Sequence, residues 1–344
     1  MELDKDLQSI QEVRCLVARA KAAQKALASW SQEKLDALVK ALAEAAEAQA
    51  EPLAKMAAEE TGFGIWQDKV IKNLLGSRIV YEHIKDQKTV GVVREDRERR
   101  VQEIAVPVGV VAALIPSTNP TSTVMYKALI SIKAGNAIVF SPHPNARRCI
   151  AETVRVLTEA AKKAGAPDGL IGCIETITPQ ATDALMKHPD TGIILATGGA
   201  AMVKAAYSSG NPALGVGPGN GPAFIERSAD IRRAVGRILD SKTFDNGTIC
   251  ASEQSVVTER CIEEEVVGEF CRQGGYFLSE EQSARVEKLI MRANNTMNPA
   301  IVGKSALTIA KMAGIEVPQG TRVLLSRQTE VGHNRPYSRE KLCP

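Results

Sequence analysis

The stretch Val108-Gly-Val-Val-Ala-Ala-Leu-Ile115, followed by Pro-Ser-Thr-Asn-Pro-Thr-Ser-Thr over residues 116–123, decides the fold class. The first part is almost entirely apolar, and the second part places small polar residues and prolines where a helix can begin. A short apolar run that leads into a helix is typical of a strand buried on both faces, as in a parallel sheet covered by helices. We therefore expect a strand over 108–115 and a helix over 122–134.

The same alternation continues along the chain. Short apolar runs occur at 137–140, 193–196 and 223–225, and stretches with helical spacing occur at 146–164, 180–188 and 200–208. Because helical stretches separate the apolar runs, the pattern predicts an α/β fold with a doubly wound parallel sheet.

The segments around this alternation have patterns of their own. Residues 5–60 have apolar positions at helical spacing and predict two or three amphipathic helices, and a further helix is expected over 68–86. Residues 89–108 alternate around the charged tip Arg94-Glu-Asp-Arg-Glu-Arg, which predicts a protruding β-hairpin. The segment 211–222 is rich in proline and glycine, and we interpret it as a loop with a functional role.

The length of the chain predicts two packed units, because 344 residues exceed the usual domain size of ~100–200 residues. A helix ending near Lys242, a turn at Asp245-Asn-Gly and a strand at 255–258 predict that the second unit is also α/β. We divide the chain into a Rossmann-like unit (1–87 and 109–240), a hairpin (88–108) and a second α/β unit (241–344).

Composition excludes several classes of protein. The net charge is only +3, without a basic run, which argues against nucleic acid as a partner. We find no apolar run of the ~18 residues that a membrane span needs and no signal peptide, so we expect a cytoplasmic protein. The seven cysteines include no Cys-x-x-Cys pair, and the four histidines have no ligand spacing, so we expect neither a disulfide framework nor a metal site.

Cys250 is the candidate nucleophile. It follows Phe244-Asp-Asn-Gly-Thr-Ile and precedes Ala-Ser-Glu-Gln, at a junction between a predicted helix and a predicted strand. A thiolate exposed at such a junction can attack a carbonyl carbon if its pKa is lowered. From local sequence alone, the alternative is a cysteine that packs as a small buried hydrophobe.

Two segments at predicted strand ends could bind ligands. Asn119 follows the first buried strand and could donate its amide to an oxyanion, although Thr121 or Ser122 could equally make this segment a plain helix cap. Thr197-Gly198-Gly199 forms a glycine turn before a helix and could offer backbone N–H groups to a diphosphate. A tight turn without a ligand would have the same sequence, because the dinucleotide fingerprint of three spaced glycines is absent.

Two further segments leave alternatives open or exclude a motif. His143, in Ser-Pro-His-Pro after a predicted strand, could contact the adenosine part of a nucleotide or serve only as a turn residue. Gly215-Val-Gly-Pro-Gly is not a phosphate-binding loop, because Pro218 interrupts it and an apolar strand follows.

Several strings of the sequence together resemble one family. They are residues 115–123 (Ile-Pro-Ser-Thr-Asn-Pro-Thr-Ser-Thr), 141–144 (Ser-Pro-His-Pro), 195–199 (Leu-Ala-Thr-Gly-Gly), 206–210 (Ala-Tyr-Ser-Ser-Gly) and 244–254 (Phe-Asp-Asn-Gly-Thr-Ile-Cys-Ala-Ser-Glu-Gln). Their order and spacing resemble the CoA-acylating aldehyde dehydrogenases, in particular the aldehyde dehydrogenase half of the bifunctional aldehyde-alcohol dehydrogenases. The resemblance extends from the first helix to Glu340-Lys-Leu-Cys-Pro.

The resemblance implies a set of site residues. Cys250 would be the nucleophile, and Asn119 with the backbone N–H of Cys250 would bind the oxyanion. The residues that would bind the cofactor NAD are Ser117, Thr118, Ser141, His143, Thr197, Gly198, Gly199, Gly217 and Glu340. Glu340 matches the glutamate that holds the nicotinamide ribose in the family.

The resemblance also implies the reaction. Hydrolytic members carry a glutamate in the loop that corresponds to 211–222, where this chain has no carboxylate, so water should attack a thioester slowly and the thiol of coenzyme A should accept the acyl group. We expect aldehyde, CoA and NAD+ to be converted reversibly into acyl-CoA and NADH, with a short-chain aldehyde such as acetaldehyde. The alternatives are a hydrolytic aldehyde dehydrogenase and a non-catalytic assembly or nucleotide-binding module.

The family resemblance has consequences for assembly, location and chain length. The hairpin is similar to the oligomerisation arm of the family, so we expect a homodimer or a larger homo-oligomer. The lumen of a bacterial microcompartment is the alternative to a cytoplasmic location. The resemblance also implies that 1–87 and 109–240 form the NAD-binding domain and 241–344 the catalytic domain. Because the family continues past the last shared motif, we expect the catalytic domain to be truncated and the chain by itself to be weakly active.

Overall fold

The computed structural model describes residues 4–292 and 296–344. It contains two compact units. The first consists of the chain up to Thr61 together with Lys69–Gly217, and the second consists of Gly62–Asp68 together with Pro218–Pro344.

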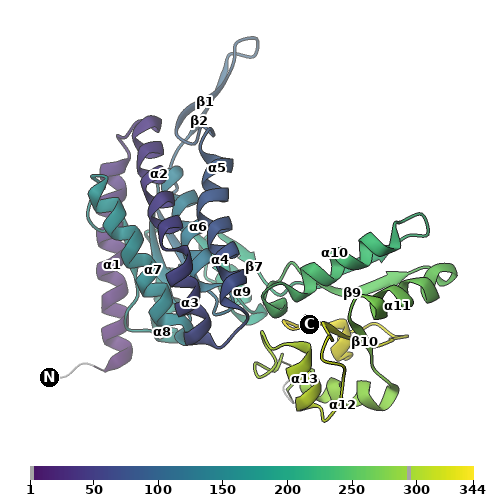
Figure 1. Cartoon of the computed structure of the whole chain (residues 1–344). Coiled ribbons are helices and arrows are strands. Elements are labelled where there is room, and N and C mark those ends of the chain that lie inside the picture. Colours follow the sequence, from purple (N-terminus) through teal and green to yellow (C-terminus); the bar gives the residue numbers. More distant parts are fainter. Residues whose placement is uncertain (1–3, 293–295) are drawn as a thin grey trace. The chain divides into compact units, whose positions relative to one another are not determined.

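Within the described residues, the first unit is built on a five-stranded parallel sheet (Figure 1). Its strands are β3 (Val110–Leu114), β4 (Ala137–Ser141), β5 (Ile171–Cys173), β6 (Thr191–Thr197) and β7 (Ala213–Val216). Their order is β5-β4-β3-β6-β7, so the chain moves outward from β3 first in one direction and then in the other. This order confirms the predicted doubly wound sheet and puts its switch point between β3 and β6.

Helices connect the strands and cover the sheet. Those between the strands are α6 (Pro120–Lys133), α7 (Arg147–Lys163), α8 (Pro179–Lys187) and α9 (Ala200–Tyr207), and the N-terminal ones are α1 (Lys5–Leu27), α2 (Gln32–Ala48) and α3 (Ala50–Thr61). Leu35, Leu38 and Leu42 of α2 recur at helical spacing and are at most 1% exposed. Burial of each such side chain stabilises the fold by about 2 kcal/mol, so one face of this polar helix suffices to hold it on the unit.

The predicted helix over 68–86 is interrupted. It consists of α4 (Trp66–Leu74), a π-helical turn (Leu75–Ile79) and α5 (Val80–Ile84). At Gly76 a Cβ atom would lie 2.6 Å from the carbonyl oxygen of Ser122, so only glycine allows this close approach to α6. A π-helical turn is thus placed where the helix contacts its neighbour most closely.

The predicted hairpin is confirmed. Strands β1 (Gly91–Asp96) and β2 (Val101–Ala105) pair antiparallel, and Figure 1 shows them extending beyond the helices of the first unit. Arg94 and Glu103 form an ion pair across the two strands. The side chains of Val101 and Ile104 are 51% and 60% exposed, so the hairpin offers apolar surface as well as charge.

The second unit combines two short parallel strand pairs with four helices in its described residues. Strand β8 (Gly221–Ile225) pairs with β9 (Glu253–Thr258), and β10 (Gly275–Phe277) pairs with β11 (Val323–Leu325). The helices are α10 (Ile231–Thr243), α11 (Glu263–Arg272), α12 (Glu280–Ile290) and α13 (Ala306–Met312). Val235 and Leu239 of α10 pack with Phe270 of α11 in one apolar cluster, and Ile290, Ile301 and Ile309 belong to another.

Three details differ from the sequence-based expectations. The segment 211–222 is not all loop, because Ala213–Val216 adds an edge strand to the sheet and Gly221 begins β8. The run 223–225 pairs with β9 in the second unit and does not extend the main sheet. For the same reason the second unit begins at Pro218, whereas the predicted boundary follows residue 240.

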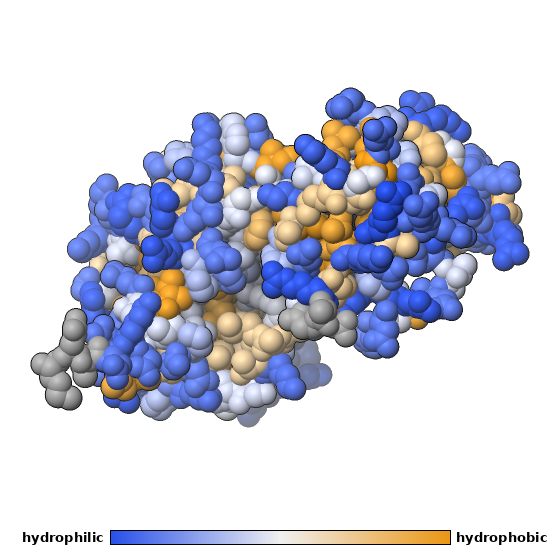
Figure 2. Space-filling model, turned by 90° about the horizontal axis from the view of Figure 1, so that it is seen from below, coloured by the Kyte–Doolittle hydropathy of each residue, from blue (hydrophilic) through white to orange (hydrophobic). Residues whose placement is uncertain are grey.

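The molecular surface carries many hydrophilic side chains. On the face shown in Figure 2 the apolar residues form separate patches among charged ones. Among the described residues, no helix has the length and apolar character needed to cross a membrane.

Candidate active site

The carboxyl ends of β3 and β6 bring two predicted segments to the same edge of the first unit's sheet. Leu114 and Ala196 are paired in register, so residues 115–119 and 197–199 both begin at the switch point of the sheet. Ligands of doubly wound sheets bind at this position. The geometry therefore agrees with the predicted location of a binding site in this unit.

Buried Lys127 ties these two strand ends together. Its Nζ atom donates to the carbonyl oxygen of Leu114 at 2.9 Å and to that of Leu195 at 2.8 Å. Burial of the ammonium group lowers the pKa of Lys127 to about 7. The sequence analysis did not identify this residue, whose neighbours on α6 are mainly apolar.

Asn119 is the N-cap residue of α6, but its side chain does not cap the helix. Its Oδ1 atom instead accepts a hydrogen bond from Nζ of Lys72 at 2.7 Å. Thr121 and Ser122 lie inside the first turn of α6, so the alternative that one of them caps this helix is wrong. The hydroxyl group of Thr121 donates to Oδ1 of Asn73 at 2.7 Å. Ser117 and Thr118 are half-buried beside Asn119, and the carbonyl oxygen of Thr118 accepts from Lys69 at 3.3 Å.

The glycine turn after β6 has room for an anion. Gly199 is exposed, and no atom lies within 4 Å of the position that a Cβ atom would take. Among the described residues, no side chain caps the start of α9. The first backbone N–H groups of this helix therefore point out of its end without a side-chain acceptor. Thr197 is half-buried, and the N–H of Gly198 donates to the carbonyl oxygen of Val216. This turn therefore fits the diphosphate of a dinucleotide.

Ser141 and His143 follow β4 and already make local contacts. The hydroxyl group of Ser141 shares a hydrogen bond of 2.8 Å with that of Thr182, and Ser141 is buried. Nδ1 of His143 accepts from the N–H of Asn145 at 3.1 Å, at the start of the short 3-10 helix Pro144–Ala146. Burial lowers the pKa of His143, so the ring is mostly neutral at neutral pH. His143 therefore stabilises this turn, and its contact with adenosine stays a prediction.

In the second unit, Cys250 follows an unusual turn. Asp245, Asn246 and Gly247 have φ angles of +51°, +49° and +69°, in the left-handed region that disfavours most side chains. Oδ1 of the buried Asp245 accepts from the N–H of Ile65 at 2.6 Å, and its own N–H donates to Oδ2 of Asp68 at 2.7 Å. Contacts with a segment almost 180 residues away thus hold the turn that precedes the thiol.

The backbone of Cys250 also has close neighbours. A Cβ atom on Gly219 would lie 1.7 Å from the carbonyl oxygen of Cys250, so only glycine fits between these segments. The N–H of Gly219 donates to Oε1 of Glu340 at 2.8 Å, and burial raises the pKa of Glu340. Cys250 itself is half-buried, so the thiol is not sealed in an apolar core. Gly217, also half-buried, is the last residue of the first unit.

A half-buried lysine fixes the segment that carries Glu340. Nζ of Lys242 donates to Oε1 of Gln254 at 3.1 Å and to the carbonyl oxygen of Lys341 at 2.9 Å. The N–H of Lys341 donates to the same oxygen of Gln254 at 2.8 Å. Burial lowers the pKa of Lys242 to about 8. Because Gln254 lies in β9, four residues after Cys250, these bonds link Glu340 to the strand that follows the thiol.

The sequence pattern did not predict that the lysines of α4 face inward. Lys69, Lys72 and Asn73 are 2%, 5% and 0% exposed, whereas Ile71 and Leu75 are 53% and 50% exposed. Lys69, Lys72 and Asn73 are spaced three and four residues apart, as on one face of an amphipathic helix. In this helix the polar face points inward and the apolar face outward. The helical spacing of Lys69, Lys72 and Asn73 was the feature of the sequence that could have identified them as one face.

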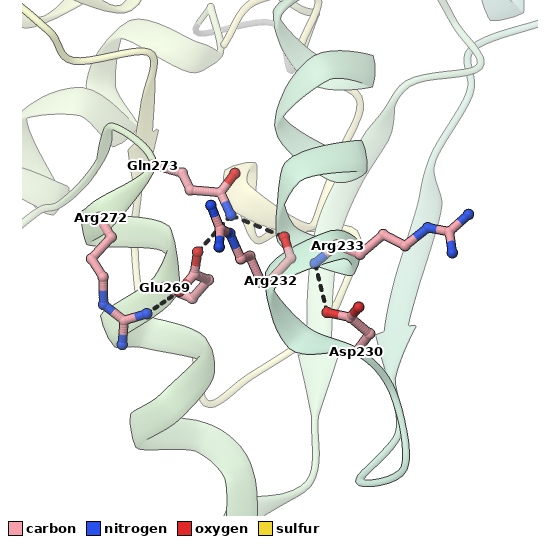
Figure 3. Close-up of a pocket in the computed structure, with 6 residues that line it drawn as sticks. All are labelled: Asp230, Arg232, Arg233, Glu269, Arg272 and Gln273. Atoms are coloured by element: carbon pink, nitrogen blue, oxygen red, sulfur yellow. Dashed lines mark hydrogen bonds and ion pairs between the residues drawn. The ribbon is translucent and has the colours of Figure 1, made fainter.

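A surface pocket in the second unit contains no predicted residue. Figure 3 shows it between the start of α10 and the end of α11, lined by Asp230, Arg232, Arg233, Glu269, Arg272 and Gln273. The carboxylate of Glu269 pairs with Arg272, and Asp230 accepts from the backbone N–H of Arg233. These acids serve an ion pair and a helix cap, so the pocket shows no arrangement suited to catalysis.

The sequence profile of the aldehyde dehydrogenase family matches residues 6–336 of this chain. The chain belongs to the aldehyde dehydrogenase family. It is 48% identical over 336 residues to the bifunctional aldehyde-alcohol dehydrogenase of Escherichia coli. That match covers 98% of this chain and 38% of the relative, so the chain spans well under half the length of that relative.

Solved structures of family members agree in fold. A probable aldehyde dehydrogenase of Listeria monocytogenes is 65% identical, with a TM-score of 0.97 over 99% of this chain and 76% of that one. An acetylating aldehyde dehydrogenase of Geobacillus thermoglucosidasius is 56% identical, with a TM-score of 0.96 over 100% of this chain and 76% of that one. The predicted resemblance to the acylating members and the predicted fold class are therefore confirmed.

Proposed function

We propose that this chain carries the catalytic cysteine of a CoA-acylating, NAD-dependent aldehyde dehydrogenase. The reaction converts an aldehyde, CoA and NAD+ into acyl-CoA, NADH and a proton, and it is reversible. One observation carries the proposal: the half-buried Cys250 follows a left-handed turn, and Gly219 of the carboxylate-free segment 211–222 is pressed against its backbone.

Cys250 and Asn119 have the reacting roles in this proposal. The thiolate of Cys250 adds to the aldehyde carbon and forms a hemithioacetal oxyanion. The side-chain amide of Asn119 and the backbone N–H of Cys250 donate to this oxyanion. When the hemithioacetal has been oxidised, the acyl group stays on Cys250 as a thioester.

Residues of each unit suit a different part of NAD. The N–H groups of the turn Thr197–Gly199 suit its diphosphate, and the carboxylate of Glu340 suits the hydroxyls of its nicotinamide ribose. Ser117, Thr118, Ser141, His143 and Gly217 complete the proposed set. Bound NAD+ supplies the acceptor for the hydride that leaves the substrate carbon.

The acyl acceptor is the thiol of CoA in this proposal, and water is the alternative. Activation of water against the thioester requires a general base, and the segment 211–222 contains no carboxylate or histidine. CoA brings its own nucleophilic sulfur, which attacks the thioester carbonyl and releases Cys250 as the leaving thiolate. The relative from Geobacillus, which is described as acetylating, has the same preference by name.

The test measures NADH formation with aldehyde and NAD+, with and without CoA, on the protein at its full natural length. We expect sustained turnover only with CoA. Cys250→Ala should lower the rate by at least about 10³-fold, whereas Cys261→Ala, which removes an exposed thiol of the same unit, should have no effect. Sustained turnover without CoA would favour the hydrolytic alternative, and turnover by Cys250→Ala would overturn the assignment of the nucleophile.

The substrate is proposed to be a short-chain aldehyde such as acetaldehyde. The 56% identity to an acetylating aldehyde dehydrogenase of Geobacillus thermoglucosidasius supports this class of substrate. Comparison of kcat/KM across a panel of straight-chain and carboxylated aldehydes, with CoA and NAD+, tests this. A higher kcat/KM for a carboxylated aldehyde than for acetaldehyde would contradict it.

The hairpin β1–β2 is proposed to join copies of the chain in a homodimer or a larger assembly, in the cytoplasm or in a microcompartment. Its exposed apolar residues Val101 and Ile104 and its unpaired strand edges suit contact with a second copy. Replacement of residues 91–105 by a short Gly-Ser turn should reduce the mass measured by light scattering to that of one subunit. An unchanged mass would exclude the hairpin as the joining element.

A further inference from the structure

We propose that Lys72 is a positioning residue for the oxyanion-binding amide of Asn119. The inference rests on the proposed function, because it deepens the role given there to Asn119. It concerns the first unit alone, which contains both residues.

The contact fixes which end of the Asn119 amide faces the helix. An ammonium group can only donate hydrogen bonds, so the atom that receives one from Nζ of Lys72 at 2.7 Å must be the carbonyl oxygen Oδ1. Nδ2 of Asn119 must then point to the opposite side. One of its hydrogens lies toward the hydroxyl oxygen of Thr118, at a donor–acceptor distance of 3.3 Å. Lys72 thereby presents the donating end of the amide to the substrate side.

The charge of Lys72 also strengthens the donor. A cation at the carbonyl oxygen draws electron density from the amide nitrogen and makes its N–H groups better hydrogen-bond donors. Lys72 is only 5% exposed, so water screens this effect weakly. The effect on the oxyanion is therefore electrostatic as well as geometric.

Neighbouring contacts hold the same loop in place. Asn73, the next residue of α4, accepts from the hydroxyl of Thr121 and donates to the carbonyl oxygen of Ala50 at 2.8 Å. Lys69, one helical turn earlier, donates to the carbonyl oxygen of Thr118. The inward face of α4 thus contacts residues 118–121 at three places, and Lys72 makes the contact with the side chain of Asn119.

The decisive experiment compares Lys72→Met, Asn119→Ala and the double variant in the full-length protein. Lys72→Met keeps the bulk of the side chain and removes the donor and the charge. We expect kcat to fall about 10- to 100-fold, with KM for aldehyde and NAD+ changed less than about threefold. Lys72→Gln, which can still donate to Oδ1 without a charge, should lie between Lys72→Met and the wild type.

The double variant separates positioning from a structural role. If Lys72 acts through Asn119, the double variant should be no slower than Asn119→Ala alone. The matched control is Lys133→Met, which removes another buried lysine of the same unit that pairs with Asp36, and which should lower stability without changing kcat. The rate of Cys250 alkylation by iodoacetamide should be the same in all variants.

The outcomes are distinguishable. An unchanged kcat in Lys72→Met, or losses that multiply in the double variant, would overturn the positioning role. Full activity of Asn119→Ala would instead refute the oxyanion role in the proposed function, whatever Lys72→Met does. Loss of activity in Lys72→Met together with slowed Cys250 alkylation would show a general structural disturbance and would also overturn the proposal.

Discussion

The region around Asn119 and the region around Cys250 are built in different ways. Asn119 follows a regular strand of a parallel sheet, and its position depends on local elements: β3, α6 and the adjoining face of α4. Cys250 follows three left-handed residues that are held by Ile65, Asp68 and the segment around Gly303, which lie far away in the sequence. Regular structure therefore positions one of the two proposed groups, and long-range contacts with an irregular turn position the other.

Apart from replacement of Cys250 itself, the largest effect is expected at Gly219. In Gly219→Ala the new Cβ atom would overlap the carbonyl oxygen of Cys250, from which it would be 1.7 Å away, so the backbone at the thiol must move. A displacement of ~1 Å at a reacting group costs about 100-fold in rate, and we expect kcat to fall at least that much. Gly221→Ala is the control, because no atom lies within 4 Å of its Cβ position. Equal kcat values for the two variants would show that the turn tolerates movement.

Next in size is the stability of the turn itself. Asp245→Ala removes the acceptor for the N–H of Ile65 and leaves that group without its partner, so the free energy of unfolding should fall by about 2–3 kcal/mol. Asp240→Ala removes only an exposed ion pair with Arg322 and should cost less than about 1 kcal/mol. Urea unfolding of both variants measures the difference, and similar losses would contradict the importance of the long-range contacts.

The first unit should respond to pH through Lys127. Its pKa in the folded state is lowered to about 7 from 10.5, so between these values the unfolded chain binds a proton that the folded chain does not. Stability due to this residue therefore rises with pH across that window, by at most about 1.4 kcal/mol per pH unit. Lys127→Met should lack this slope. Unfolding free energies of both proteins from pH 7 to 9.5 would reveal it, and parallel curves would argue against a shifted lysine.

The smallest effect is expected at Gly199, the counterpart of Gly219 in the first unit. Gly199 has a φ angle of −66° and open space around it, so alanine should leave stability unchanged or raise it by up to about 1 kcal/mol. If the diphosphate of NAD lies on this turn, the added methyl group should raise KM for NAD+ about three- to tenfold. Isothermal titration calorimetry with NAD+ provides a second readout. An unaltered affinity for NAD+ would show that the diphosphate binds elsewhere.

The sequence predicted regular elements better than irregular ones, for physical reasons. Val110–Leu114 was identifiable because a strand buried on both faces must be apolar throughout. Ala213–Val216 was missed because an edge strand needs partners on one side only, and the prolines and glycines of the segment 211–222 around it suggested a loop. The inward lysines of α4 were missed because burial of charge reverses the usual rule for helices.

The same difference between regular and irregular structure applies to the candidate site. Asn119 and the turn Thr197–Gly199 were placed correctly at strand ends, because the topology of parallel sheets fixes where such ends meet. The contacts of Asp245 with Ile65 and Asp68, and of Glu340 with Gly219, could not be predicted. They depend on approaches between distant segments that leave no periodic pattern in the sequence.

The π-helical turn at Leu75–Ile79 has a consequence for the register of the whole helix. Such a turn is equivalent to one inserted residue, and one residue corresponds to a rotation of about 100° about the helix axis. The side chains after this turn are therefore rotated relative to the lysines before it, compared with their directions in an unbroken α-helix. Deletion of a single residue within this turn would rotate Lys72 away from the loop, so the orientation of one amide depends on a helical insertion a few residues farther along the chain.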